Sequence, residues 1–135
     1  YRIWNDPVRK VFGRRYVTQV EEPLDVECMR TAAAVLCGTH DYRAFCSLKR
    51  FKKSTVRTIE KIAVRQEGPL IEIAYTGDGF LYHMVRILTG TLVEAGLGFR
   101  SAESMKEILE SRDRACAGRL MPPEGLMLMS VEYLK

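Results

Sequence analysis

Several classes of protein are excluded by what the sequence lacks. Its longest apolar stretch, residues 80–95, is interrupted by His83, Arg86 and Glu94, so it falls short of the roughly 18 consecutive apolar residues of a membrane-spanning helix. The four cysteines form no C-x-x-C pair, and neither histidine lies at zinc-finger spacing from them. No redox motif or structural zinc site is therefore indicated. We expect no membrane segment, reduced thiols and a cytoplasmic protein.

Common catalytic motifs are also missing. The sequence contains no P-loop, no G-x-G-x-x-G fingerprint, and no side chains that would assemble a Ser/His/Asp triad or a metal cluster. With 135 residues, of which 47% are hydrophobic and 28% are charged, the chain suits one globular domain with a core. It starts at Tyr1 without the charged and apolar regions of a signal peptide, and we expect it to be a piece of a longer chain.

The positive charge is concentrated in two segments. The net charge is only +4, but residues 1–15 and 43–65 together contain 13 basic and 2 acidic residues. Such clustering predicts a surface that contacts the phosphates of RNA or DNA. Each cluster taken alone is also explained by an ordinary solvated surface. The candidate nucleic-acid contacts are Arg9, Lys10, Arg14, Arg15, Lys49, Arg50, Lys52, Lys53 and Arg57.

Hydrophobic periodicity predicts the element order β, α, β, β, α, α, β, which is typical of an α+β domain. We expect an antiparallel sheet with helices packed on one face. The predicted strands are residues 1–5, 58–66, 70–76 and 126–134, and the predicted helices are residues 25–37, residues 80–95 and a short helix capped by Ser101. Residues 40–45 are expected to form one further turn, and residues 47–55 an exposed loop or strand edge.

One arginine lies within the most apolar predicted helix. Arg86 occupies the middle of residues 80–95, which are apolar nearly all round and should therefore be buried. A buried guanidinium needs an anionic partner, and none of its neighbours three and four residues away is acidic. A functional partner would come from elsewhere in the fold or from a missing part of it. A surface position, or a structural ion pair with Asp78 or Glu72, is an equally good explanation.

Three further residues lie on the same predicted helix or near a turn. Gly90 lies one turn from Arg86, where a missing side chain allows close approach of a ligand or tight helix packing. A lone histidine such as His83 on an apolar helix is more often a hydrogen-bonded core residue than a catalyst. His40, beside Asp41, is expected to be a capping or turn residue.

Four stretches of the chain agree with one known family. The run from Gly79 to Gly90, GFLYHMVRILTG, resembles the F-x-x-x-M-[IV]-R-x-[IL]-x-G signature of the tRNA pseudouridine synthase A family. The stretches YRIWN at 1–5, GTHDYRAF at 38–45 and EGLML at 124–128 resemble that family in order and spacing. The resemblance covers essentially the whole chain. It implies an RRM-like half of the pseudouridine synthase fold, so residues 1–135 would be the C-terminal domain.

The resemblance also implies an activity. That family isomerises uridine to pseudouridine in the anticodon stem-loop of tRNA, as a homodimer and without cofactor or metal. By resemblance, Arg86 would pair with the catalytic Asp, and Leu126 with Gly125 would line the uracil pocket. The family's nucleophilic Asp lies in an R-T-D-x-G-V-H motif that this sequence lacks. We therefore expect this chain to form one wall of the active site and to be inactive alone. The alternatives are a stand-alone RNA-binding module and a protein-interaction domain.

Overall fold

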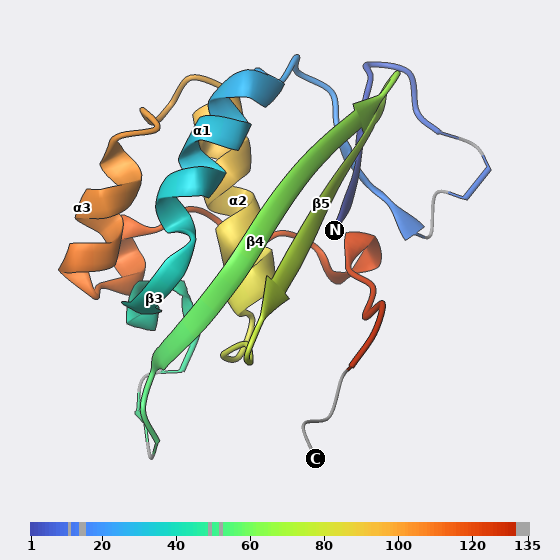
Figure 1. The fold of residues 1–135 in the computed structure, drawn as a ribbon. Coiled ribbons are helices and arrows are strands. Elements are labelled where there is room, and N and C mark those ends of the chain that lie inside the picture. The colour runs from blue at the N-terminus through green and yellow to red at the C-terminus, as the bar shows by residue number, and fades with distance from the viewer. Residues whose placement is uncertain (11, 14–15, 49, 52, 132–135) are drawn as a thin grey trace.

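A five-stranded sheet with helices on one face forms the domain (Figure 1). The computed structural model describes residues 1–135 except residues 11, 14–15, 49, 52 and 132–135. The sheet order is β2-β1-β5-β4-β3. The strands are β1 (Arg2–Asn5), β2 (Thr18–Val20), β3 (Gly38–Asp41), β4 (Val56–Glu67) and β5 (Leu70–Gly77), and the helices are α1 (Val26–Leu36), α2 (Met84–Gly96) and α3 (Ser104–Ser111). The predicted α+β class is confirmed.

The long hairpin of β4 and β5 forms the centre of the sheet, as the sequence predicts. Its turn passes through Gly68, whose φ of +56° lies in the left-handed region that suits glycine. Side chains alternate between the two faces, so that Val64 and Ile73 are paired and buried beneath the helices, while Ala63 and Ala74 are paired on the opposite face. One face of the hairpin therefore contributes its side chains to the core of the domain.

Helices α1 and α3 follow their predicted positions closely. The Asp25 side chain accepts a hydrogen bond from the Cys28 amide and caps α1, which packs against β4 and α2. The Ser101 hydroxyl accepts a hydrogen bond from the Ser104 amide at the start of α3. The inner face of α3 consists of Met105, Ile108 and Leu109, which are buried. In Figure 1, α3 lies on the outer side of α1.

Helix α2 begins four residues later than predicted. The Tyr82 carbonyl accepts a hydrogen bond from the Ser47 amide, and His83 adopts left-handed dihedral angles, with φ 62° and ψ 9°. Contacts with another segment therefore replace the helical bonds of residues 80–83. From Ile87 to Val93 the helix is buried on all sides, as its composition indicates.

Two short strands at the edges of the sheet are not predicted by the periodicity. Strand β2 pairs with β1 in parallel, and β3 pairs antiparallel with β4. The sheet is therefore mixed and not wholly antiparallel. Strands of three and four residues are too short for a reliable alternation pattern. Within the predicted turn of residues 40–45, a 3-10 helix covers Arg43–Phe45, whereas residues 40–41 belong to β3.

The predicted final strand is wrong over the residues that the structure describes. Two 3-10 helices, Arg114–Cys116 and Pro123–Gly125, precede it, and residues 126–131 form no strand. In Figure 1 this segment leaves the sheet, so its backbone has no strand to pair with. An alternating pattern cannot supply a partner, and Leu128 and Met129 remain 80% and 77% exposed. The rest of the predicted strand, residues 132–134, lies outside the described residues.

Candidate functional site

Arg86 lies in the first turn of α2 and not in the middle of the helix. Its Nε donates a hydrogen bond of 2.7 Å to the Met121 carbonyl, and the Met121 amide donates one to the Arg86 carbonyl. The side chain is half-buried. A cation is unfavourable at a helix N-terminus, where the helix dipole stabilises negative charge. The stability of α2 therefore does not account for this arginine.

No carboxylate of the described residues lies within 4.0 Å of Arg86. The two acidic residues considered as structural partners are engaged elsewhere. Glu72 pairs with Arg2 at 3.3 Å, and Asp78 accepts a hydrogen bond from the Thr58 amide. The structural ion pair is thus absent from the part of the chain that is described, and Arg86 keeps two guanidinium nitrogens for another group.

A C-terminal segment, residues 117–121, crosses α2 and positions Met121 over Arg86. A Cβ atom on Gly90 would lie 1.8 Å from the Arg119 carbonyl oxygen. Only glycine therefore allows this approach. Of the two explanations for Gly90, tight packing is the one observed, and the group that approaches is the chain's own backbone.

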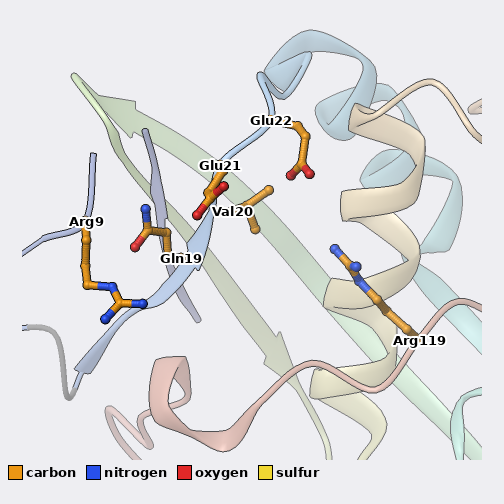
Figure 2. A pocket seen from close by; sticks show the side chains of 6 residues that line it. All are labelled: Arg9, Gln19, Val20, Glu21, Glu22 and Arg119. Atoms are coloured by element: carbon orange, nitrogen blue, oxygen red, sulfur yellow. The ribbon is translucent and has the colours of Figure 1, made fainter. Parts of the chain in front are cut away.

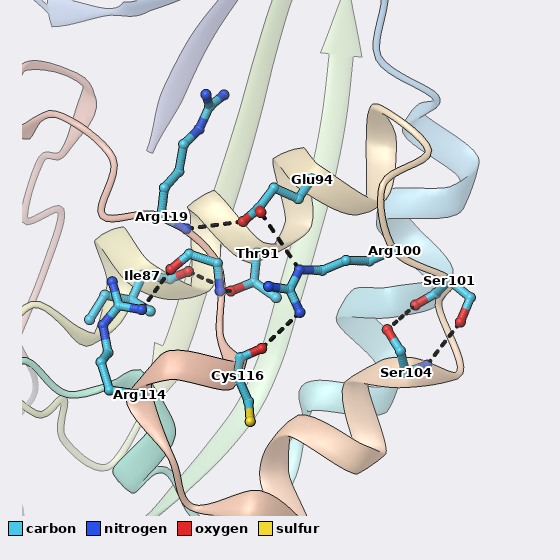
Figure 3. A network of polar contacts seen from close by, with 10 residues as sticks. Ile87, Thr91, Glu94, Arg100, Ser101, Ser104, Arg114, Cys116 and Arg119 are labelled. Carbon is cyan, nitrogen blue, oxygen red and sulfur yellow. Dashed lines mark hydrogen bonds and ion pairs between the residues drawn. The ribbon is translucent and has the colours of Figure 1, made fainter.

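Polar contacts fix the same segment on α2 (Figure 3). The buried Thr91 hydroxyl accepts a hydrogen bond from the Gly118 amide at 2.9 Å, and the Glu94 carboxylate accepts one from the Arg119 amide at 3.0 Å. Arg100 lies 3.7 Å from Glu94 and donates to the Cys116 carbonyl. This network is not predicted from the sequence. The available signal was Glu94, the single acidic residue in an apolar helix.

Substitution of Gly90 tests how firmly this segment is held. We expect Gly90→Ala to destabilise the protein by about 1–3 kcal/mol, the range for overpacked sites. Alanine favours a helix over glycine by up to about 1 kcal/mol, but the clash dominates because it involves backbone that cannot rotate away. Urea or thermal unfolding measures the change. Gly79→Ala is the matched control, since its Cβ would lie at an ordinary 3.5 Å from Arg57. An unchanged or raised unfolding midpoint for Gly90→Ala would contradict the expectation.

Gly125 and Leu126, the residues assigned to the uracil pocket by resemblance, follow shortly after this segment. A Cβ on Gly125 would come within 2.6 Å of the Arg2 carbonyl and 2.7 Å of the Tyr1 ring. Gly125 therefore packs closely on the start of the sheet. The Leu126 side chain, in contrast, is 41% exposed.

The Tyr1 hydroxyl joins Pro122, the residue directly after this segment, to the sheet. It donates a hydrogen bond to the Pro122 carbonyl and lies 2.6 Å from the Thr18 hydroxyl. Burial raises the pKa of the Tyr1 phenol, while the Thr18 hydrogen bond and the guanidiniums of Arg86 and Arg119 oppose the rise. The positive charges of Arg86 and Arg119 therefore both act on the Tyr1 hydroxyl, which lies where α2, β1 and the C-terminal segment meet.

Both histidines take part in local hydrogen bonds. His40 Nε2 lies 2.9 Å from the carbonyl of Cys37, the C-cap residue of α1, which confirms the expected capping role. His83 is not a core residue, contrary to the more frequent case. It precedes the first turn of α2, is half-buried, and its Nδ1 lies 3.0 Å from the Ser47 hydroxyl.

The two basic segments lie at opposite ends of the molecule (Figure 1). The loop after β1 carries Arg9 and Lys10, and the segment from Ser47 to the start of β4 carries Arg50, Lys53 and Arg57. They do not form one continuous patch, so a single bound molecule would have to span the domain. Four of the candidate contacts, Arg14, Arg15, Lys49 and Lys52, lie outside the described residues.

A hollow of about 310 Å³ lies beside the first basic loop (Figure 2). Arg9 and Arg119 contribute positive charge to its wall, and Glu21 and Glu22 contribute negative charge. This mixture does not favour an ion of either sign. Over the described residues, no three His, Cys, Asp or Glu side chains group as a metal site. The helices described there are also too short or too polar to cross a membrane.

The comparisons with known proteins agree on one family. The model of a family described as tRNA pseudouridine synthase matches residues 32–134. The tRNA pseudouridine synthase A of Brevibacillus brevis is 44% identical over 133 residues, which cover 98% of this chain and 54% of that protein. The corresponding protein of Halalkalibacterium halodurans is 46% identical over 127 residues, covering 94% and 48%. The chain thus spans about half the length of the curated relatives it matches.

Proposed function

The chain belongs to the tRNA pseudouridine synthase family, and we propose that it is the C-terminal half of an enzyme that isomerises uridine to pseudouridine in the anticodon stem-loop of tRNA. In this proposal the enzyme works in the cytoplasm as a homodimer, without cofactor or metal. One observation carries the assignment of the site. Arg86 is held firmly on α2, yet no described carboxylate pairs with it.

The geometry of Arg86 suits a catalytic carboxylate from the other half. Because Nε is bound to the Met121 carbonyl, the two terminal nitrogens are left to form parallel hydrogen bonds with a carboxylate. An adjacent cation lowers the pKa of a carboxyl group and keeps it ionised. The helix N-terminus adds to this effect. Arg86 would thus hold the nucleophile charged and oriented toward the ribose or the base.

The remaining steps follow from the chemistry of the isomerisation. The target uridine is flipped out of the RNA stack into the cleft. The Asp carboxylate then assists cleavage of the N-glycosidic bond, uracil rotates, and a carbon–carbon bond forms through uracil carbon five. Carbon five loses its proton to solvent, and N1, which is freed from the ribose, takes up a proton, so that the product is an isomer of uridine. The exposed Leu126 would pack on the base and exclude water, while Gly125 fixes the place of Leu126 through its contact with Tyr1.

Binding of tRNA is proposed to use both basic segments. Lysine and arginine that neutralise phosphates release counterions, so the affinity should fall steeply with salt. Their separation by the length of the domain is compatible with an extended RNA ligand (Figure 1). The five described residues proposed for these contacts are Arg9, Lys10, Arg50, Lys53 and Arg57.

Release of tritium from tRNA labelled at uracil carbon five tests the proposal. The complete protein is expected to release tritium in proportion to the target uridines, because the carbon-five proton is lost in each turnover. A stand-alone RNA-binding module would bind tRNA with salt-dependent affinity and release none. A protein-interaction domain would show neither property. Loss of release after replacement of the anticodon-arm uridines by cytidine checks the position of the reaction.

A further inference from the structure

Two stacked rings lie on the surface just before α2. The ring centroids of Tyr82 and His83 are 3.7 Å apart, and the ring planes are inclined by 27°. Tyr82 is 54% exposed. Neither ring takes part in the proposed role of Arg86, although His83 precedes Arg86 by only three residues. An exposed, ordered aromatic stack therefore stands next to the proposed catalytic centre without an assigned partner.

The backbone holds the two rings in a fixed arrangement. His83 has a left-handed φ of 62°, a conformation that is uncommon for residues other than glycine. Ser47 stabilises it from the neighbouring loop, because its amide donates to the Tyr82 carbonyl at 3.3 Å and its hydroxyl lies 3.0 Å from His83 Nδ1. The stack is thus preorganised, so little conformational entropy remains to be lost when a ligand packs on it.

Positively charged residues come from the segments that adjoin the stack. The loop that starts at Ser47 carries Arg50 and Lys53, and the Arg57 side chain lies against Gly79. Arg86 follows His83 by three residues, and its charge acts on the His83 ring. Burial and the Arg86 guanidinium lower the pKa of His83, which favours a neutral ring at neutral pH. An apolar surface flanked by cations matches a nucleotide, whose base is flat and apolar and whose phosphates are negative.

We propose that Tyr82 and His83 form a platform on which an unpaired tRNA base adjacent to the modified uridine stacks. This inference rests on the proposed function, because it takes tRNA as the ligand. The platform differs from the uracil site, which we place at Leu126. Stacking of one base would stabilise the opened anticodon arm while the target uridine occupies the cleft. Aromatic rings serve unpaired RNA bases in this way in many RNA-binding folds.

The test uses the complete protein with the variants Tyr82→Leu and Tyr82→Phe. Leucine keeps an apolar side chain and removes the ring, whereas phenylalanine keeps the ring and removes the hydroxyl. Phe99→Leu is the matched control, since Phe99 is 74% exposed after α2 and away from the stack. Binding is measured with an anticodon-arm RNA that carries 2-aminopurine next to the target uridine, and kcat and KM are measured by tritium release.

Tyr82→Leu is expected to raise Kd and KM about tenfold or more, in line with the loss of one stacked base. The quenching of 2-aminopurine on binding should disappear, and kcat should change little. Tyr82→Phe and Phe99→Leu should behave as the unaltered protein. A merely structural role for Tyr82 would not change the quenching of a base in the RNA.

Three results would overturn the platform. One is an unchanged Kd, KM and quenching in Tyr82→Leu. Another is an equal loss in Tyr82→Phe, which would assign the effect to the hydroxyl. The third is a lowered unfolding midpoint with unchanged RNA binding, which would show that the ring packs against the rest of the protein. If the unaltered protein binds and turns over tRNA normally, these results leave the proposed function intact. Absence of tRNA binding by the unaltered protein would overturn both.

Discussion

Arg86→Ala in the complete protein is expected to reduce tritium release by about 10²- to 10³-fold, the loss typical when one preorganised electrostatic contact is removed from an active site. The reason is the position of the guanidinium, which the Met121 carbonyl fixes through Nε while leaving two nitrogens for a carboxylate. Without this cation the proposed catalytic Asp would lose both its orientation and the neighbouring positive charge that keeps it ionised. Steady-state tritium release from tRNA measures the effect, which should appear in kcat and leave KM within a few-fold.

Two further variants make this result specific. Arg86→Lys is expected to recover little activity, because lysine keeps the charge but cannot form the planar pair of hydrogen bonds. Arg30→Ala serves as the control, since Arg30 is an arginine on α1 that bonds to the Val64 carbonyl and pairs with Glu27 at the surface. Undiminished release by Arg86→Ala would remove Arg86 from the mechanism. A rise in KM with unchanged kcat would make it an RNA contact only.

The isolated chain is expected to release no tritium above background at any concentration. Its sequence has no R-T-D-x-G-V-H motif to supply the nucleophile, and Arg86 has no carboxylate within reach among the described residues. Under the proposed mechanism the chain would supply only one wall of the cleft and would lack the carboxylate that assists the reaction. The measurement compares the chain and the complete protein at equal concentration on the same labelled tRNA.

Circular dichroism must first show that the isolated chain is folded, so that inactivity is not attributed to unfolding. A folded chain that still binds tRNA in a salt-dependent manner and releases no tritium is the expected combination. Release by the chain itself would show that it contains a complete active site, and the division of roles proposed for Arg86 would then be wrong.

Local sequence signals predicted the elements whose stability is largely local. The capping carboxylate of Asp25 and the hydroxyl of Ser101 each bond to amides a few residues ahead. The apolar spacing in α1 and α3 then directs one face of each helix to the core. For β4 and β5, the alternation of apolar and polar residues and the intervening turn were sufficient to predict the hairpin, because the two strands pair with one another.

Other elements depend on partners that are distant in sequence. The start of α2 is displaced by Ser47, which lies 35 residues before the Tyr82 carbonyl it binds. Strand β2 exists through its pairing with β1. The predicted strand after Gly125 has the appropriate alternation but no neighbour in the described part of the chain. In each case the outcome depends on whether a distant hydrogen-bond partner is present, which periodicity does not encode.

The candidate site shows the same division. The sequence pattern alone indicated that Arg86 belongs to an apolar helix and that none of the residues three or four positions away is acidic. The motif around Arg86 indicated the family. The tertiary structure decided that Arg86 lies at the N-terminus of α2, that Met121 orients it, and that Gly90 admits the segment carrying Met121.

The sequence by itself therefore determined the α+β class, three helices, the central hairpin and an arginine without an acidic neighbour on its own helix, since these depend on side-chain chemistry and on contacts between near neighbours. Only the tertiary structure decided where that arginine points, that the two basic segments lie far apart, and that Tyr82 and His83 stack beside it. The physical reason is that orientation and distance are set by long-range packing and hydrogen bonding, which join residues whose spacing along the chain carries no signal.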